Sequence, residues 1–173
     1  MRSEIGRVTE LRFRKRRRLR QKEVTQLAAE LDATLGTKTF SEGDVVDVAE
    51  GPGYEAVFSG GKALALVVGK ESFLTVRGLL KFGAMKRYVT VDMGAVKFVY
   101  NGADVMGPGI VESDPDIKPG DLVWIRDIKN RQPLAVGRAV VDAATMARKE
   151  KGKAVESIHH VGDKLWIVDE QKD

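Results

Sequence analysis

The chain has 173 residues, of which 43% are hydrophobic and 31% charged, which is enough for one large or two small domains with a buried core. It contains no cysteine, which excludes disulfides, thiolate metal sites and cysteine nucleophiles and is typical of a reducing compartment. No apolar run approaches the roughly 20 residues that span a bilayer, and the N-terminus is too basic for a signal peptide. We therefore expect a cytoplasmic protein.

The net charge of +4 is concentrated in one segment. Residues 1–20 contain nine basic and two acidic residues, a net charge of +7, whereas residues 21–84 carry −3 and residues 85–173 carry zero. So dense a block is typical of a polyanion-binding surface, because each cation placed on a phosphate releases counterions. The alternative is a solvated tail that binds nothing. The basic arm consists of Arg12, Arg14, Lys15, Arg16, Arg17, Arg18 and Arg20.

The first half of the chain predicts a small α+β unit. Apolar residues at the spacing of one helix face predict a helix over 21–35, which Gly36 ends. The sequence leaves open whether residues 12–20 continue this helix backwards or form an extended arm. A strand is expected over 45–48, two strands folded at a Gly-Gly turn within 54–68, and a short helix that ends near Gly83.

The second half predicts a closed or nearly closed β-barrel with short helices. We expect a strand at 89–91, a helix over 95–100, strands at 122–125 and 134–141, and a final strand over 158–168 with a turn inside it. Small residues alternate along 134–141, which suits strands whose backbones approach closely.

Residues suited to catalysis are few. His159 and His160 are neighbours on a predicted strand and point to opposite faces, so they cannot both bind one metal ion without distortion. The sequence indicates no oriented partner that would make either of them a general base. Asp114 and Asp116 flank a proline, which is ordinary turn composition. The glycine clusters lack the spacing of a dinucleotide or phosphate loop. We predict no catalytic centre, no cofactor and no metal site.

Two segments of the second half are candidates for backbone recognition. The glycine loop, residues 102–109, lies between a predicted helix and a strand and offers backbone N–H groups unobstructed by side chains. A structural bulge at a barrel corner is an equal alternative. The second segment is a basic cluster before the last strand, for which a solvated loop is the simpler explanation; it consists of Arg148, Lys149, Lys151 and Lys153.

The second half also resembles a known module. The segment DMGAVKFVYNGADVMGPGI (92–110) resembles the opening of a PUA domain, and KPGDLVW (118–124), LAVGR (134–138), KGKAV (151–155) and DKLW (163–166) follow in the expected order. With FLTVRGLL (73–80) and IHHVGDKLW (158–166), the chain is similar to the malignant-T-cell-amplified-sequence family and its archaeal relatives over residues 40–168. The basic arm has no counterpart in that resemblance.

The resemblance implies an α+β protein with a small N-terminal pre-PUA domain (1–84, with the basic arm) and a PUA-type pseudo-barrel of about six strands with short helices (85–173). It also implies an RNA-binding surface, made of Lys97, Gly102, Ala103, Asp104, Met106, Gly107, Pro108, Gly109, Lys151 and Lys153.

Three functions follow as hypotheses. The leading one is an RNA-binding translation factor that acts on tRNA or rRNA at the small ribosomal subunit, with a protein partner that carries an initiation-factor-like domain and with no membrane association. The second is an accessory subunit that brings RNA to a separate tRNA or rRNA modification enzyme. The third is a protein–protein adaptor that works through the N-terminal domain.

Overall fold

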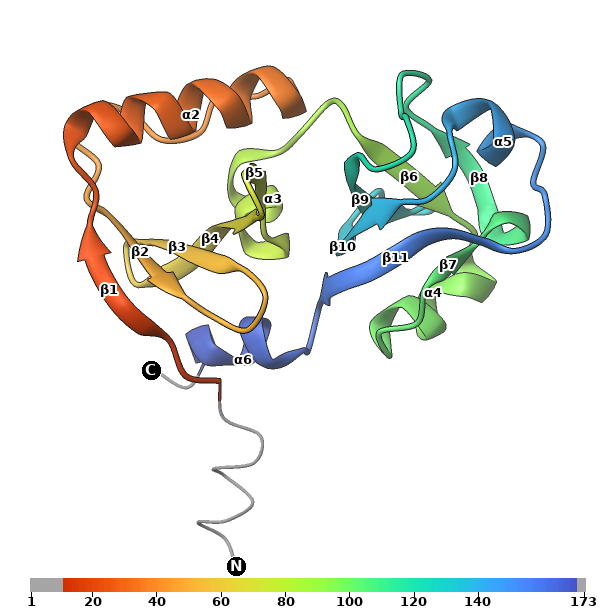
Figure 1. Ribbon diagram of the computed structural model, residues 1–173. Coiled ribbons are helices and arrows are strands. Elements are labelled where there is room, and N and C mark those ends of the chain that lie inside the picture. Colours follow the sequence, from red (N-terminus) through yellow and green to blue (C-terminus); the bar gives the residue numbers. More distant parts are fainter. Residues whose placement is uncertain (1–10, 171–173) are drawn as a thin grey trace, which may run out of the picture.

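The computed structural model describes residues 11–170, which form two β-sheets connected by short helices (Figure 1). The elements are, in chain order, β1 (Arg14–Arg18), α2 (Gln21–Leu35), β2 (Val46–Glu50), β3 (Glu55–Ser59), β4 (Lys62–Val68), β5 (Glu71–Leu74), α3 (Val76–Phe82), β6 (Tyr88–Val91), α4 (Met93–Tyr100), β7 (Val105–Met106), the 3-10 helix η1 (Gly107–Gly109), β8 (Ile110–Ser113), β9 (Leu122–Asp127), β10 (Pro133–Ala139), α5 (Ala143–Ala147), β11 (Lys153–His160) and α6 (Lys164–Glu170). Within this part of the chain no helix combines the length and apolarity needed to cross a bilayer.

The N-terminal sheet is an antiparallel meander in the order β1-β2-β3-β4-β5, with α2 packed beside it (Figure 1). Helix α2 forms as predicted: Val24, Leu27 and Leu31 are buried on one face, and Gly36 ends the helix in the left-handed conformation. The predicted hairpin is confirmed as β3 and β4, whose turn contains two glycines at positive φ.

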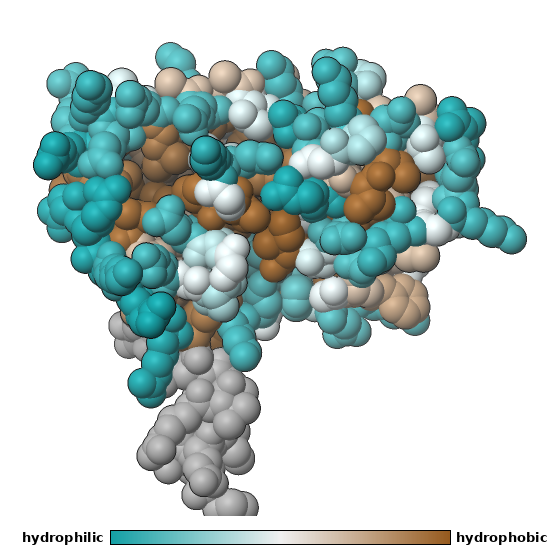
Figure 2. All heavy atoms as spheres, in the orientation of Figure 1, coloured by the Kyte–Doolittle hydropathy of each residue, from teal (hydrophilic) through white to brown (hydrophobic). Residues whose placement is uncertain are grey.

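The basic arm is extended and does not continue helix α2 backwards. Arg14–Arg18 form β1, the edge strand of the N-terminal sheet, and pair antiparallel with β2. All five side chains are exposed, and the register is irregular between Arg14 and Arg17, where Lys15 has a φ of 53°. Figure 2 shows hydrophilic residues over the end of the molecule that α2 and β1 form.

The second sheet is the expected nearly closed barrel of six strands, in the order β7-β11-β10-β9-β6-β8. Strands β6 and β9 run parallel, and the other neighbouring pairs are antiparallel. The small residues of β10 have the predicted role at Gly137, where a Cβ would overlap the carbonyl oxygen of Glu156 on β11.

The prediction of a strand over 158–168 is wrong. Strand β11 begins earlier and ends at His160, and after Gly162 the chain enters α6. Asp163 starts this helix, because its carboxylate accepts a hydrogen bond from the backbone N–H of Trp166 at 2.9 Å. Leu165 and Val168, three residues apart, then face the N-terminal core.

The two halves of the chain share apolar packing. The core around α2 and the N-terminal sheet also contains Leu122, Trp124 and Val136 of the barrel. The indole of Trp124 donates a hydrogen bond to the carbonyl of Lys86 in the connecting segment at 2.8 Å. Since α3 ends at residue 82 and β6 begins at residue 88, we propose the division into two domains between residues 84 and 85.

Candidate nucleic-acid interface

Helix α4 presents apolar side chains to solvent. It is capped by Asp92, whose carboxylate accepts a hydrogen bond from the backbone N–H of Ala95 at 2.9 Å. Val99 is its one buried side chain, whereas Phe98 is 55% exposed and Tyr100 is also exposed. Large apolar side chains exposed in this way are candidates for a binding surface.

The glycine loop is held against the turn that precedes β11. Gly107 donates a hydrogen bond to the carbonyl of Gly152 at 2.9 Å, and a Cβ at Gly107 would overlap the carbonyl oxygen of Glu150. This close approach requires glycine. The N–H of Gly107 is therefore buried and already used, so the expectation that it is exposed for a ligand is wrong at this position.

A pocket of about 690 Å³ opens between α4 and the glycine loop. We call it the α4 pocket; it is lined by Asp92, Gly94, Ala95, Phe98, Val99, Ala103, Asp104, Val105, Met106, Pro108 and Gly109. Most of these side chains are apolar, and the two carboxylates accept hydrogen bonds from backbone N–H groups of the protein itself. The pocket is therefore suited to a flat, largely apolar group such as a nucleobase.

Exposed lysines lie on α4 and on the turn that holds the glycine loop, the elements next to this pocket. The ammonium of Lys97 is 5.2 Å from the centroid of the Phe98 ring, and Lys149 and Lys151 lie on the turn that holds the glycine loop. Within the described part of the chain these three lysines form no ion pair. They leave positive charge beside an apolar pocket, the combination that single-stranded nucleic acids bind.

Asp104 connects the glycine loop to β11. Its Oδ1 accepts a hydrogen bond from the backbone N–H of Ser157 at 2.8 Å, and its Oδ2 lies 3.2 Å from the ammonium of Lys153. The Ser157 hydrogen bond, followed by that of Lys153, holds the pKa of Asp104 below its usual range. Lys153 also lies 3.9 Å from Glu156, so it is a partly neutralised member of the basic cluster.

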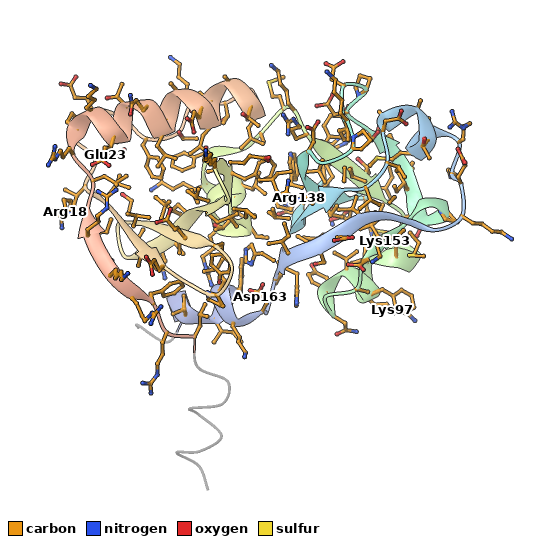
Figure 3. The ribbon with its side chains drawn as sticks, viewed as in Figure 1. Arg18, Glu23, Lys97, Arg138, Lys153 and Asp163 are labelled. Atoms are coloured by element: carbon orange, nitrogen blue, oxygen red, sulfur yellow. The ribbon has the colours of Figure 1, made fainter. Side chains whose placement is uncertain are left out.

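The basic arm lies at the other end of the molecule from the α4 pocket, as the labels Arg18 and Lys97 show in Figure 3. Arg17 donates to Glu23, with Nη2 and Oε2 3.0 Å apart. This hydrogen bond and a second one from the backbone N–H of Arg20 lower the pKa of Glu23 to about 2. The arm is thus an ordered part of the N-terminal sheet.

The candidate catalytic residues have structural roles. His159 is buried, and the fold uses both of its ring nitrogens. Asp114 forms the predicted turn by accepting the backbone N–H of Asp116 at 3.0 Å. Over the described residues, no three histidine or carboxylate side chains are grouped so that they could hold a metal ion.

The residues predicted for RNA binding fall into two regions. The first region is the α4 pocket with the elements next to it, which carry Lys97, Ala103, Asp104, Met106, Gly107, Pro108, Gly109, Lys151 and Lys153. Gly102 lies outside the lining of this pocket, beside His160. The second region is the basic arm. Contact with RNA stays a prediction for all of these residues.

Part of the apolar lining of the pocket is not indicated by the sequence. The sequence pattern assigns Phe98 and Ala95 only to a helix and Val105 only to the backbone of the glycine loop, whereas all three line the pocket. The available signal was that residues 93–100 hold more apolar side chains than one face of an eight-residue helix can bury.

Comparison with known proteins places this geometry in a class. The PUA domain family matches residues 87–161, which include α4, the glycine loop and β11. The second half of the chain is therefore a PUA domain, a module of RNA-binding proteins.

The similarity extends to the N-terminal half. An uncharacterised protein of Methanocaldococcus jannaschii is 35% identical over 158 residues, which are 90% of this chain and 98% of that protein. The crystal structure of a hypothetical protein of Pyrococcus horikoshii has a TM-score of 0.77 at 34% identity and covers 90% of this chain and 99% of that one. Translation machinery-associated protein 20 of Saccharomyces cerevisiae is 36% identical over 92 residues, about half of each chain. The chain belongs to the family of PUA proteins that includes these proteins and the malignant T-cell-amplified sequences.

Proposed function

We propose that this chain is an RNA-binding protein of translation that holds tRNA or rRNA at the small ribosomal subunit. The observation that carries the proposal is the α4 pocket, a largely apolar cavity in a PUA domain. Three lysines on the elements next to it form no ion pair within the described residues. The names of the yeast and animal relatives support a role in translation. On the resemblance alone, we include a protein partner with an initiation-factor-like domain and a cytoplasmic location in the proposal.

Binding would combine stacking with phosphate contacts. An unpaired base that enters the α4 pocket would stack on Phe98 and contact Met106, both about half exposed in the free protein. Stacking of a base on an aromatic side chain contributes about 1–3 kcal/mol. Lys97 and Lys151 would lie beside the phosphates that flank this base and would make the binding salt-dependent.

The same pocket would read base identity weakly. Asp92 and Asp104 are its two carboxylates, and each already accepts a backbone hydrogen bond, from Ala95 and Ser157 respectively. Oδ2 of Asp104 also faces Lys153, which leaves Oδ2 of Asp92 as the one oxygen of these two carboxylates without a partner among the described residues. Few side-chain groups of the lining therefore remain to hydrogen-bond a base edge, and stacking tolerates every base. Recognition would therefore depend on an accessible unpaired base rather than on a sequence.

The proposal is tested with fluorescently labelled tRNA and the variant Phe98→Ala/Met106→Ala. We expect the affinity to fall about 5- to 150-fold, the loss of one stacked base, with only a small change in thermal unfolding because both side chains are about half exposed. Met85→Ala, which removes another exposed apolar side chain (79% exposed) outside the pocket, is the matched control. Equal affinity of the pocket variant and the control would contradict the proposal.

The cellular target is tested by sedimentation. The wild-type protein should co-sediment with small ribosomal subunits, and the pocket variant should do so less. Co-purification with an RNA-modification enzyme in place of small subunits would instead support the accessory-subunit hypothesis.

A further inference from the structure

Strand β1 carries more positive charge than its carboxylate partners neutralise. Its five consecutive basic residues face three carboxylates, those of Asp47, Glu50 and Glu23. Asp47 and Glu50 are each shared between two cations, so each of these two clusters keeps a surplus of one positive charge. Within the described residues, the strand therefore presents two surplus charges in an ordered array.

The geometry of the Asp47 cluster leaves guanidinium donors for a second ligand. Arg16 lies 3.2 Å from Asp47 through Nε, and Arg18 contacts the other oxygen of the same carboxylate, also through Nε. Their terminal nitrogens, which are the nitrogens that usually bind phosphate in a fork, are not used by Asp47. The Arg16 guanidinium also stacks 4.5 Å from the centroid of the Phe58 ring, which fixes its orientation.

The Glu50 cluster is more open. Arg14 and Lys15 lie 4.0 and 3.8 Å from its carboxylate, and their side chains are 79% and 75% exposed. Loose pairs of this kind contribute little to stability, so the stability of the N-terminal sheet does not explain the density of charge. Charge on an edge strand also protects it against pairing with the strands of other chains. One or two lysines are enough for that protection, so it does not explain five consecutive basic residues.

We propose that β1 is a second RNA-binding surface, which holds the phosphate backbone of the same RNA whose unpaired base enters the α4 pocket. The inference rests on the proposed function, because the PUA domain is what makes RNA the polyanion. The inference adds to the proposed function a separate binding surface on the N-terminal domain and a minimum size of the RNA.

The two surfaces require a ligand that spans the molecule. Arg18 on β1 and Lys97 beside the α4 pocket lie at opposite ends in Figure 3. A compact chain of this length is on the order of 40 Å across. A short oligonucleotide that fills the pocket would not reach β1, whereas a folded RNA of the size of tRNA would. The ligand class is therefore a large structured RNA with an unpaired end or loop.

The test removes only the surplus charges. In Arg14→Gln/Arg18→Gln, Glu50 keeps Lys15 and Asp47 keeps Arg16, so no carboxylate loses its last partner. The matched control, Lys38→Gln/Lys81→Gln, removes two charges from exposed positions of the same domain outside β1. Circular dichroism melting verifies that both variants fold as the wild type does.

The readout is the slope of the logarithm of affinity against the logarithm of salt concentration. For tRNA, we expect the β1 variant to lose about 1.4 units of slope, from two phosphate contacts at about 0.7 each. Between about 50 and 200 mM salt, the factor by which affinity falls should therefore be roughly 7-fold smaller for the β1 variant than for the wild type. A single-stranded oligonucleotide of about four nucleotides, enough to fill one site and too short to reach β1, should bind all three proteins with the same slope.

Three results would overturn the inference: an unchanged slope of the β1 variant on tRNA, an equal loss of slope in the control, or an equal loss on the short oligonucleotide. The proposed function fails separately, when Phe98→Ala/Met106→Ala binds tRNA normally. If the β1 variant still showed a reduced slope in that case, β1 would remain supported as an RNA-binding surface, and the α4 pocket would be rejected as one.

Discussion

The backbone N–H of Val76 donates a hydrogen bond to Nε2 of His159 at 3.2 Å, across 83 positions of sequence. Because Nε2 accepts, the ring proton is on Nδ1, which donates to the carboxylate of Asp163 at 2.9 Å. The end of the last barrel strand is thereby joined to the first turn of α3 and to the start of α6.

Asp163 should make the stability of the protein depend on acid pH. Burial raises the pKa of this carboxyl, but hydrogen bonds from His159 and from the backbone N–H groups of Trp166 and His160 outweigh burial and hold the pKa below its usual range. A depressed folded-state pKa contributes stability that is present above the unfolded value, about 3.9, and is lost as the pH falls through the folded value.

We therefore expect Asp163→Asn to lower the free energy of unfolding at pH 7 by about 1.5–3 kcal/mol, the value of hydrogen bonds to a charged group. Below about pH 4 the difference from the wild type should shrink. Urea unfolding at several pH values measures it, and a difference that stays constant down to pH 2 would contradict the assignment.

Gly107→Ala should disturb both the stability and the binding surface. Its Cβ would overlap the carbonyl oxygen of Glu150, so the turn before β11 must move, at a cost of about 1–3 kcal/mol. Gly109→Ala is the control, because its Cβ would lie 3.3 Å from that of Ala95 and needs a smaller adjustment. Thermal unfolding compares the two variants. Equal melting temperatures would show that the turn yields without cost.

Arg77→Lys should loosen α6. The Arg77 guanidinium lies 3.8 Å from the centroid of the Trp166 ring and donates to the Trp166 carbonyl at 3.1 Å. A lysine keeps the charge but loses the planar stacking. Faster amide hydrogen exchange in residues 164–168, with the exchange of α2 unchanged, is the expected result. Unchanged exchange in α6 would assign its docking to the apolar contacts of Leu165 and Val168.

Lys153→Gln should raise the pKa of Asp104 while leaving it below its usual range. The backbone N–H of Ser157 is the larger cause of the depression, and the lysine is the smaller one. Carboxyl NMR titration of both proteins measures the shift. A return to the usual range would mean that the lysine dominates.

The local sequence pattern was enough to predict elements whose apolar residues and glycines mark both their type and their ends. Helix α2 has one buried face and a glycine end, and β3 and β4 are joined by two glycines, so each could be read from a short window of sequence. Helix α6 could not, because LWIV has strand-forming composition and its helical start depends on the Asp163 cap.

The candidate site was predictable in part for the same reason. The glycine loop has a family signature, and the resemblance found it. The contact between Gly107 and the turn at Glu150 to Gly152 joins positions more than 40 residues apart, and no local pattern indicates it. The exposed position of Phe98 likewise depends on which face of α4 the barrel covers.

The hydrogen bond from the indole of Trp124 to Lys86, within a core that both halves share, has a consequence for how the protein can be divided. A fragment cut between residues 84 and 85 would leave Leu122, Trp124 and Val136 facing water on one piece and the underside of α3 on the other. We expect neither piece to stay folded as a monomer. The two halves should therefore unfold together as one cooperative unit, and an RNA bound at one end would stabilise both halves.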